Sequence, residues 1–163
     1  MRVAIIADTH LPRGGRRLPQ SCLDRLVAAD LIMHAGDFTA RSVLAELEAL
    51  GPPVRAVHGN VDEPLLTRLL DQSIELELEG ARVAMIHDGG PASGRLERLR
   101  RRFPSADLVI FGHSHIPLHE TGADGLQLFN PGSPTERRRA PHHTMGLATI
   151  TRGAVALEHL VLA

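Results

Sequence analysis

The sequence VAIIADTH, at residues 3–10, joins a short apolar run to a polar one. The run from Val3 to Ala7 predicts a buried strand, because strands buried on both faces carry continuous aliphatic residues. Asp8 and His10 follow this run directly. The stretch therefore predicts a strand whose carboxyl end presents a carboxylate and an imidazole.

Polar residues follow four further apolar runs in the same way. They stand at His34-Ala35-Gly36-Asp37, His58-Gly59-Asn60, His87-Asp88-Gly89-Gly90 and Gly112-His113-Ser114-His115. Ligands of α/β sheets bind outside the carboxyl ends of the strands, so we expect these side chains to gather at one edge. Carboxylate, amide and imidazole groups without sulfur suit divalent Mn, Ni, Fe, Co or Zn.

The candidate ligands are too many for one ion. Structural zinc sites are usually closed by about four ligands, whereas seven are present here: Asp8, His10, Asp37, Asn60, His87, His113 and His115. A pair of divalent ions that share a carboxylate fits this number better. Two ions about 3.5–4 Å apart can hold a phosphate between them. The sequence therefore predicts a dinuclear metal centre suited to phosphoryl transfer.

Helical and strand patterns alternate through the first two thirds of the chain and give way to strands alone. The predicted helices cover residues 20–29, 40–50, 63–70 and about 93–103. The predicted strands cover residues 3–7, 31–34, 54–57, 74–78, 83–86, 108–111, 117–120, 126–129, 145–151 and 154–161. This order predicts an α/β or α+β sandwich of two sheets. No repeat or linker interrupts it, so we expect a single domain over residues 1–163.

Composition limits the classes of function. Aromatic residues make up only 2% of the chain and the net charge is -1, so the chain offers neither a base-stacking platform nor a basic surface for nucleic acid. Cys22 is the only cysteine, which excludes internal disulfides and a thiolate zinc site. Serine-hydrolase, P-loop and Rossmann fingerprints are absent as well. Without a charged leader or a long apolar segment, we expect a cytoplasmic protein that does not enter a membrane.

The ordered motifs resemble a known family. Asp8-x-His10, Gly36-Asp37, Gly59-Asn60, His87, Gly112-His113-x-His115 and Asn130-Pro131-Gly132-Ser133 are similar to the motifs of the calcineurin-like metallophosphoesterases, most of all their short bacterial and archaeal phosphodiesterase branch. The resemblance covers nearly the whole chain. It implies a four-layer αββα fold, a two-sheet β-sandwich flanked by helices. It also implies that Asp8, His10, Asp37 and His115 bind a first metal ion, that Asn60, His87 and His113 complete a second site, and that Asp37 bridges the two.

The implied reaction is hydrolysis of a small phosphate ester by attack of a metal-bridging hydroxide. Asn60 is a candidate both to ligate metal and to orient the phosphate, and His113 is a further substrate-binding candidate. Many relatives carry a histidine after the Gly-Asn pair, where it can protonate the leaving group. Val61 occupies that position here and cannot transfer a proton. Asp62, His10 or a water could substitute, and the sequence does not choose among them.

Other functions stay open at this point. A non-catalytic protein-interaction scaffold of the same fold, like the retromer subunit, is the main alternative, although all seven ligand positions carry competent residues. A phosphomonoesterase or pyrophosphatase could use the same site. The sequence leaves open the metal ion, manganese among the candidates, and whether exposed hairpin edges form a homo-oligomer.

Further histidines and arginines have less defined roles. We expect His34 and His58 to pack or to position ligands, and His119, His142, His143 and His159 to lie on surfaces or loops. Two arginine clusters could contact a substrate anion or could simply be solvated: Arg13, Arg16 and Arg17, and Arg137 to Arg139. The run from Arg95 to Arg102 predicts an exposed helix face without a functional role.

Overall fold

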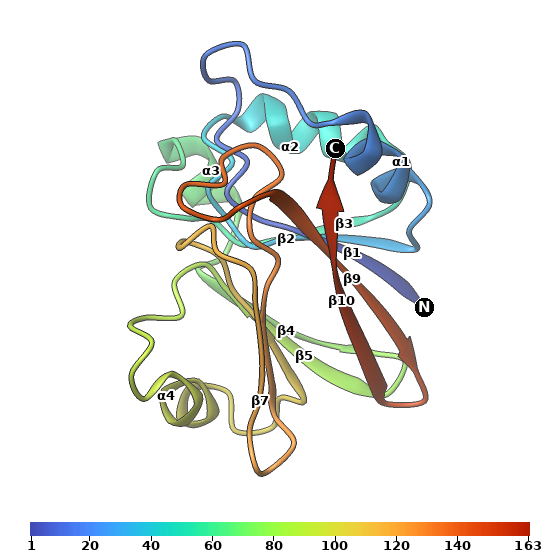
Figure 1. The fold of residues 1–163 in the computed structure, drawn as a ribbon, viewed down its shortest axis with the longest axis vertical. Coiled ribbons are helices and arrows are strands. Elements are labelled where there is room, and N and C mark those ends of the chain that lie inside the picture. Colours follow the sequence, from blue (N-terminus) through green and yellow to red (C-terminus); the bar gives the residue numbers. More distant parts are fainter.

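The computed structural model describes residues 1–163 and contains two five-stranded sheets (Figure 1). The first sheet has the order β10 (Ala154–Leu162), β9 (His143–Thr151), β1 (Arg2–Ile6), β2 (Leu31–His34) and β3 (Val54–Ala56). The second has the order β4 (Ser73–Leu78), β5 (Ala81–Ile86), β6 (Leu108–Ile110), β8 (Gln127–Asn130) and β7 (Leu118–Thr121). The helices are α1 (Gln20–Val27), α2 (Arg41–Glu48), α3 (Pro64–Leu69) and α4 (Arg95–Arg102).

Parallel pairing aligns the strand ends that matter for the site. In the first sheet β1, β2 and β3 are parallel, and the register pairs Ile6 with His34 and His34 with Ala56. In the second sheet β5, β6 and β8 are parallel, with Met85 beside Ile110. The loops that leave β1, β2 and β3 therefore start at one edge of the first sheet, and those that leave β5 and β6 start at one edge of the second.

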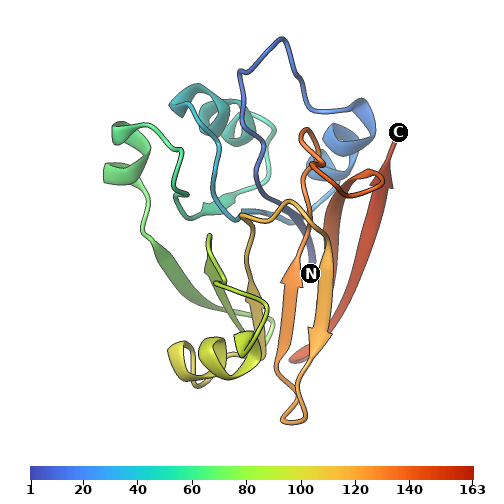
Figure 2. The ribbon, with the colours of Figure 1, turned by 60° about the vertical axis from the view of Figure 1, so that its left-hand side comes forward.

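Three apolar clusters separate four layers. Alternate residues of β1 point to opposite faces, as the strand geometry requires. Val3 and Ile5 pack between the two sheets, while Ala4 and Ile6 pack against α1, α2 and α3 on the outer face of the first sheet. A third cluster holds α4 on the outer face of the second sheet through Leu99. Figure 2 shows the helices on these two outer sides, which confirms the predicted αββα sandwich.

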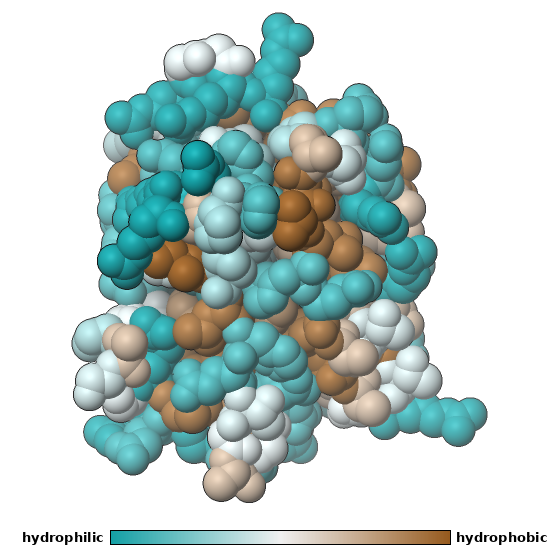
Figure 3. Space-filling view, in the orientation of Figure 1, coloured by the Kyte–Doolittle hydropathy of each residue, from teal (hydrophilic) through white to brown (hydrophobic).

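Local sequence explains the helices. In α2 the buried residues Val43, Leu44 and Leu47 lie on one face, as a helix covering a sheet requires. Pro64 opens α3 at a position where a missing N–H costs nothing. No helix is long and apolar enough to cross a membrane. The face turned to the viewer in Figure 3 is mostly hydrophilic, with its apolar residues in separate small patches.

All predicted helices and strands are present, and all of their ends agree to within two residues. The prediction for His159 was wrong. This residue lies half-buried in β10, where its ring stacks on Phe129 with centroids 4.4 Å apart and its Nε2–H donates to the Asn130 carbonyl over 2.7 Å. His143 likewise belongs to a strand, β9, and not to a loop.

Adjacent residues of α1 provide a test of the packing against the first sheet. Leu26 is 0% exposed and Val27 is 54% exposed. We expect Leu26→Ala to lower the free energy of unfolding by about 2–5 kcal/mol, because it leaves a cavity, and Val27→Ala to change it by less than about 0.5 kcal/mol. Urea unfolding of both variants measures the difference. Equal effects of the two substitutions would contradict this arrangement of α1.

Candidate metal centre

The structure brings all seven predicted ligands together at the edge where the parallel strands end. Two groups form, and within each group the ligand atoms lie within 4.8 Å of one another. The first group is Asp8, His10 and His115, and the second is Asp37, His87 and His113. Asn60 adjoins the second group, because its Oδ1 lies 3.1 Å from His87 Nε2 and 3.1 Å from His113 Nδ1.

The first group contains buried polar atoms without hydrogen-bond partners. Asp8 Oδ2, His10 Nε2 and His115 Nε2 are all buried and unpartnered. Leaving such atoms unsatisfied costs free energy, and native proteins rarely tolerate it without a functional reason. A carboxylate oxygen and two imidazole nitrogens form a donor set for a divalent cation. The residues therefore fit the metal ion that the sequence predicts here.

Asp37 lies between the two groups. Its Oδ2 is 3.2 Å from His87 Nε2 in the second group and 3.5 Å from His10 Nε2 in the first. Its other oxygen, Oδ1, accepts a hydrogen bond from the Val61 N–H over 3.0 Å. One carboxylate thus faces both groups, which fits the bridging position that the sequence predicts for it.

Backbone carbonyls orient two of the imidazoles. His87 Nδ1 lies 2.7 Å from the Ala35 carbonyl and His115 Nδ1 lies 2.6 Å from the Glu136 carbonyl. A carbonyl can only accept, so each Nδ1 must carry a proton, and each Nε2 is directed toward the centre. Outer hydrogen bonds of this kind fix the tautomer and the direction of a metal-binding histidine.

The ligand loops adopt uncommon backbone conformations. Five of the candidate ligands have positive φ angles: Asp8 (55°), His10 (46°), Asp37 (60°), His113 (70°) and His115 (60°). Such conformations cost on the order of 1–3 kcal/mol each and cluster at functional sites. Close approach adds a further constraint, because a Cβ on Gly59 would collide with the Asp37 side chain and one on Gly112 would lie 2.8 Å from Asp8 Oδ2.

Asp62 connects two ligand loops. Its carboxylate accepts hydrogen bonds from the backbone N–H groups of Gly59 (2.7 Å), Asp37 (3.1 Å) and Thr39 (2.8 Å). The sequence offered Asp62 as a substitute proton donor. Because both carboxylate oxygens are engaged by backbone donors, the structure instead makes Asp62 a residue that holds the Asp37 and Asn60 loops together.

The loop that begins at Asn130 holds the first group from the other side. Ser133 Oγ donates to the Asp8 carbonyl over 2.8 Å, and Asn130 Nδ2 donates to the Gly112 carbonyl over 2.8 Å. Glu136 Oε2 lies 3.9 Å from His10 Nδ1 and pairs with Arg16 at 3.0 Å. Glu136 could not be predicted from the sequence, because no local pattern marks a residue that contacts a loop so distant along the chain.

The arginine-rich helix α4 also contacts the site loops, contrary to expectation. Arg98 Nη2 donates to the carbonyls of Gly89 (2.9 Å) and Pro91 (2.6 Å), and Arg95 Nη2 donates to that of Gly90 (3.0 Å). These bonds satisfy carbonyls in the loop that follows His87. The exposed-face prediction was therefore wrong for these two arginines, which support a ligand loop.

His34 has the packing role that the sequence predicts. The ring is fully buried, stacks on Phe38 at a centroid distance of 3.6 Å, and accepts the Gly36 N–H at Nδ1 over 3.1 Å. Burial lowers the pKa of His34 to about 3, so the ring is neutral. Its Nε2–H then donates to Thr9 Oγ1 over 3.0 Å. His34 thus links the loops after β1 and β2 without facing the centre.

The two carboxyl groups of the centre, Asp8 and Asp37, have pKa values shifted in opposite directions. Burial raises the pKa of Asp8 to about 8, with the charge of His87 acting against this rise and that of Asp37 adding to it. Burial acts on Asp37 in the same direction, yet its hydrogen bond to His87 and the charge of that ring lower the pKa of Asp37 to about 2. The protein alone thus stabilises one negative charge and disfavours the second, as expected of a site built for cations.

Hollows open on two sides of the centre. One, of about 290 Å³, is lined by Asn60 and His87 together with His58, Gln72 and Asp88. The other, of about 460 Å³, is lined by Ser114, Ile116, Arg138 and Arg139. His113 lines both.

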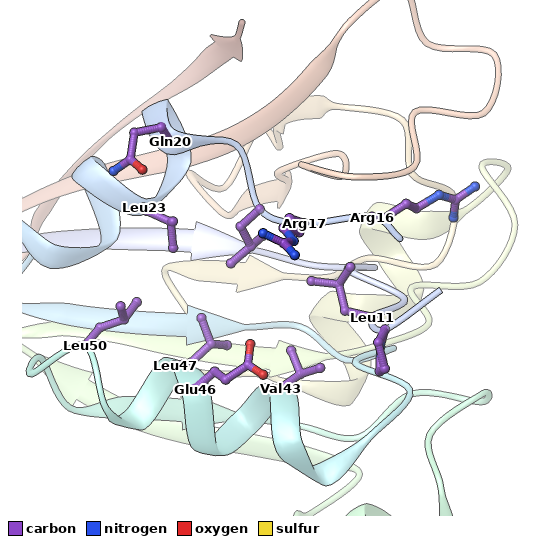
Figure 4. A pocket seen from close by; sticks show the side chains of 11 residues that line it. Leu11, Arg16, Arg17, Gln20, Leu23, Val43, Glu46, Leu47 and Leu50 are labelled. Atoms are coloured by element: carbon purple, nitrogen blue, oxygen red, sulfur yellow. The ribbon is translucent and has the colours of Figure 1, made fainter. Parts of the chain in front are cut away.

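A larger hollow of about 570 Å³ is a separate one (Figure 4). Its sides come from α1, α2 and the loop between β1 and α1, with Leu23, Val43 and Leu47 on its apolar lining. None of the candidate ligands lines it.

Known proteins resemble this chain in sequence. The sequence profile of the calcineurin-like phosphoesterase superfamily domain matches residues 1–153. A probable metallophosphoesterase of Methanothermobacter thermautotrophicus is 37% identical over 140 residues, which cover 85% of this chain and 80% of that protein.

Solved structures resemble it in fold. A Vps29 protein of Entamoeba histolytica in complex with zinc matches with a TM-score of 0.79 at 22% identity, over 99% of each chain. An archaeal phosphodiesterase matches with a TM-score of 0.75 at 22% identity, over 98% of this chain and 100% of that one. Both confirm the fold class.

Asp8 provides a test of the electrostatics of the centre. Below pH 3.8 the carboxyl is protonated in both states, but between pH 3.8 and about 8 it ionises in the unfolded chain only. In metal-free protein it therefore removes stability as pH rises through this range, on the order of a few kcal/mol. We expect Asp8→Asn, which mimics the protonated form, to stabilise metal-free protein increasingly from pH 4 to pH 8.

Urea unfolding of both proteins in the presence of a chelator, across this pH range, measures the effect. Saturating divalent metal should reverse the order of stability, because the ionised Asp8 then has a cation to bind. A difference between the two proteins that does not depend on pH would contradict the assignment.

Proposed function

This chain belongs to the calcineurin-like phosphoesterase superfamily, and from that premise we propose that it is a phosphodiesterase with a two-metal centre. The observation that carries the proposal is the set of three buried, unpartnered ligand atoms on Asp8, His10 and His115 beside a carboxylate, Asp37, that faces both groups. The cost of burying these atoms without partners is offset when cations bind, which supports a metal-dependent function.

Asn60 and His113 would orient the phosphate. Asn60 is exposed, and its Oδ1 faces His87 and His113, which leaves its Nδ2 free to donate to a phosphate oxygen. His113 stands between the two hollows, where the two ester arms of a diester can lie. A monoester would use only one of them. A pair of divalent ions, when bound, supplies Lewis-acid activation of water and neutralises charge on the phosphate.

Protonation of the leaving group is the weakest part of this site. Both ring nitrogens of His10 face carboxylates, with Nε2 3.5 Å from Asp37 and Nδ1 3.9 Å from Glu136, so His10 suits metal binding better than proton donation. Val61 is 43% exposed, and its side chain offers no proton. The site is therefore best suited to esters whose leaving group departs as a stable anion.

Hydrolysis of bis-p-nitrophenyl phosphate by metal-stripped protein tests the function. We expect activity to return when Mn²⁺, Ni²⁺, Co²⁺, Zn²⁺ or Mg²⁺ is restored in turn, and to fall at least about 100-fold in Asp37→Ala, because that carboxylate faces both metal groups. Asp24→Ala is the control, since Asp24 lies on α1 and its side chain hydrogen-bonds only to Gln20. Comparison with p-nitrophenyl phosphate separates diesterase from monoesterase activity.

The outcomes separate the alternatives. Faster turnover of the monoester would replace a phosphodiesterase with a phosphomonoesterase on the same site. Absence of turnover with every metal, in protein shown by elemental analysis to bind none, would reject the enzyme and favour a protein-interaction scaffold, as the structural likeness to Vps29 proteins allows.

Val61 provides a second test. A histidine at this exposed position could protonate a departing oxygen, an effect worth about 100-fold or more in enzymes. We expect Val61→His to accelerate hydrolysis of methyl p-nitrophenyl phosphate only slightly, because p-nitrophenolate leaves without a proton. We expect it to accelerate hydrolysis of a dialkyl phosphate strongly, because the alkoxide leaving group needs a proton. Equal acceleration of both substrates would show that protonation is not limiting. Val61→Asn is the control, because asparagine is polar and similar in size to histidine but cannot act as an acid at neutral pH.

A further inference from the structure

The two hollows beside the metal centre differ in charge. The hollow on the Asn60 side carries the Asp88 carboxylate and the neutral amide of Gln72. The hollow on the other side of His113 carries the guanidinium groups of Arg138 and Arg139. A substrate that places one arm in each hollow therefore meets a neutral or negative surface on one side and a positive surface on the other.

The arginines of the second hollow have no partners within the protein. Arg16 pairs with Glu136, and Arg137 donates to the Ala140 carbonyl over 2.9 Å. Arg138 and Arg139, by contrast, make no ion pair and no side-chain hydrogen bond in the structure, and both are exposed. Their ten guanidinium N–H donors are thus free for a ligand.

Arg138 is held near the centre by its backbone. It lies in the loop that Ser133 ties to the Asp8 carbonyl, and its φ of 48° is a restricted conformation. The candidate ligand His113 lines the same hollow as Arg138, so the guanidinium of Arg138 lies next to the metal centre.

Guanidinium groups match phosphate oxygens in geometry and charge, and bind them in pairs of parallel hydrogen bonds. The hollow has a volume of about 460 Å³, which is large enough to hold a phosphate group. We propose that Arg138 and Arg139 form a subsite for a second phosphate, so that the preferred substrate is an asymmetric diester with one phosphorylated arm. This inference rests on the proposed phosphodiesterase function and names its substrate class.

Two chromogenic substrates that differ by one phosphate test the subsite. Thymidine 5′-(p-nitrophenyl phosphate) has a neutral nucleoside arm, and its 3′-phosphorylated form carries the second phosphate. In each, water adds across one P–O bond, which releases p-nitrophenolate and a nucleoside 5′-phosphate. The leaving group needs no proton donor, so Val61 does not limit the comparison.

With metal-loaded protein we expect kcat/KM to be about 10-fold higher for the 3′-phosphorylated substrate, with most of the difference in KM. The ratio between the two substrates should fall to about 1 in Arg138→Gln/Arg139→Gln. The control is Arg101→Gln/Arg152→Gln, which removes the same charge from two exposed, unpaired arginines away from the centre and should keep the ratio. Arg152 shares the positive φ of Arg138, which matches the backbone constraint.

Equal kcat/KM for the two substrates in the unaltered protein would overturn the inference, as would a ratio that survives in the Arg138/Arg139 double variant. Loss of the ratio in the control double variant would also overturn it, in favour of general attraction by net charge. Failure of the proposed function has a different signature, since neither nucleotide nor bis-p-nitrophenyl phosphate would then be hydrolysed, and the subsite would fall with it.

Discussion

The parallel pairing of β1 with β2, and of β2 with β3, is the constraint on which the rest of the molecule depends. Ile6 lies beside His34 and His34 beside Ala56, so the three strands end level with one another. A shift of one residue would exchange the two faces of β1 and remove Val3 and Ile5 from the core between the sheets. The aliphatic core thus fixes where the ligand loops begin.

The same core explains what the sequence could predict. Continuous aliphatic runs identify buried strands, and a polar residue directly after such a run must leave the core at the strand end, so Asp8 and Asp37 were predictable as neighbours. The role of Glu136 was not predictable from the sequence. It contacts both His10 and His115, and it lies more than 100 residues after His10 in the chain. Periodicity identifies the buried face of a strand but not the distant loop that folds over its end.

Arginines show a second limit of the sequence. A dense run such as that of α4 predicts a solvated face, and for Arg101 this holds. Arg98 lies on the same helix, yet it donates to carbonyls of the loop after His87. Whether a guanidinium is free depends on which unsatisfied carbonyls lie within its reach, and that depends on tertiary structure. The same reasoning separates Arg137, which bonds its own loop, from its free neighbour Arg138.

Positive φ angles and paired buried carboxylates both oppose folding at the centre, and the surrounding structure compensates for them. Asp62 binds three backbone N–H groups there, and Ser133 holds the Asp8 carbonyl. A site held this firmly is prearranged for cations and does not form around them. Before cations bind, the ionised carboxylate of Asp37 also disfavours an anionic substrate at the centre. The unpaired arginines Arg138 and Arg139 lie on one side of His113, so their attraction for an anion is directional. In the proposed reaction, this attraction orients the diester before hydrolysis.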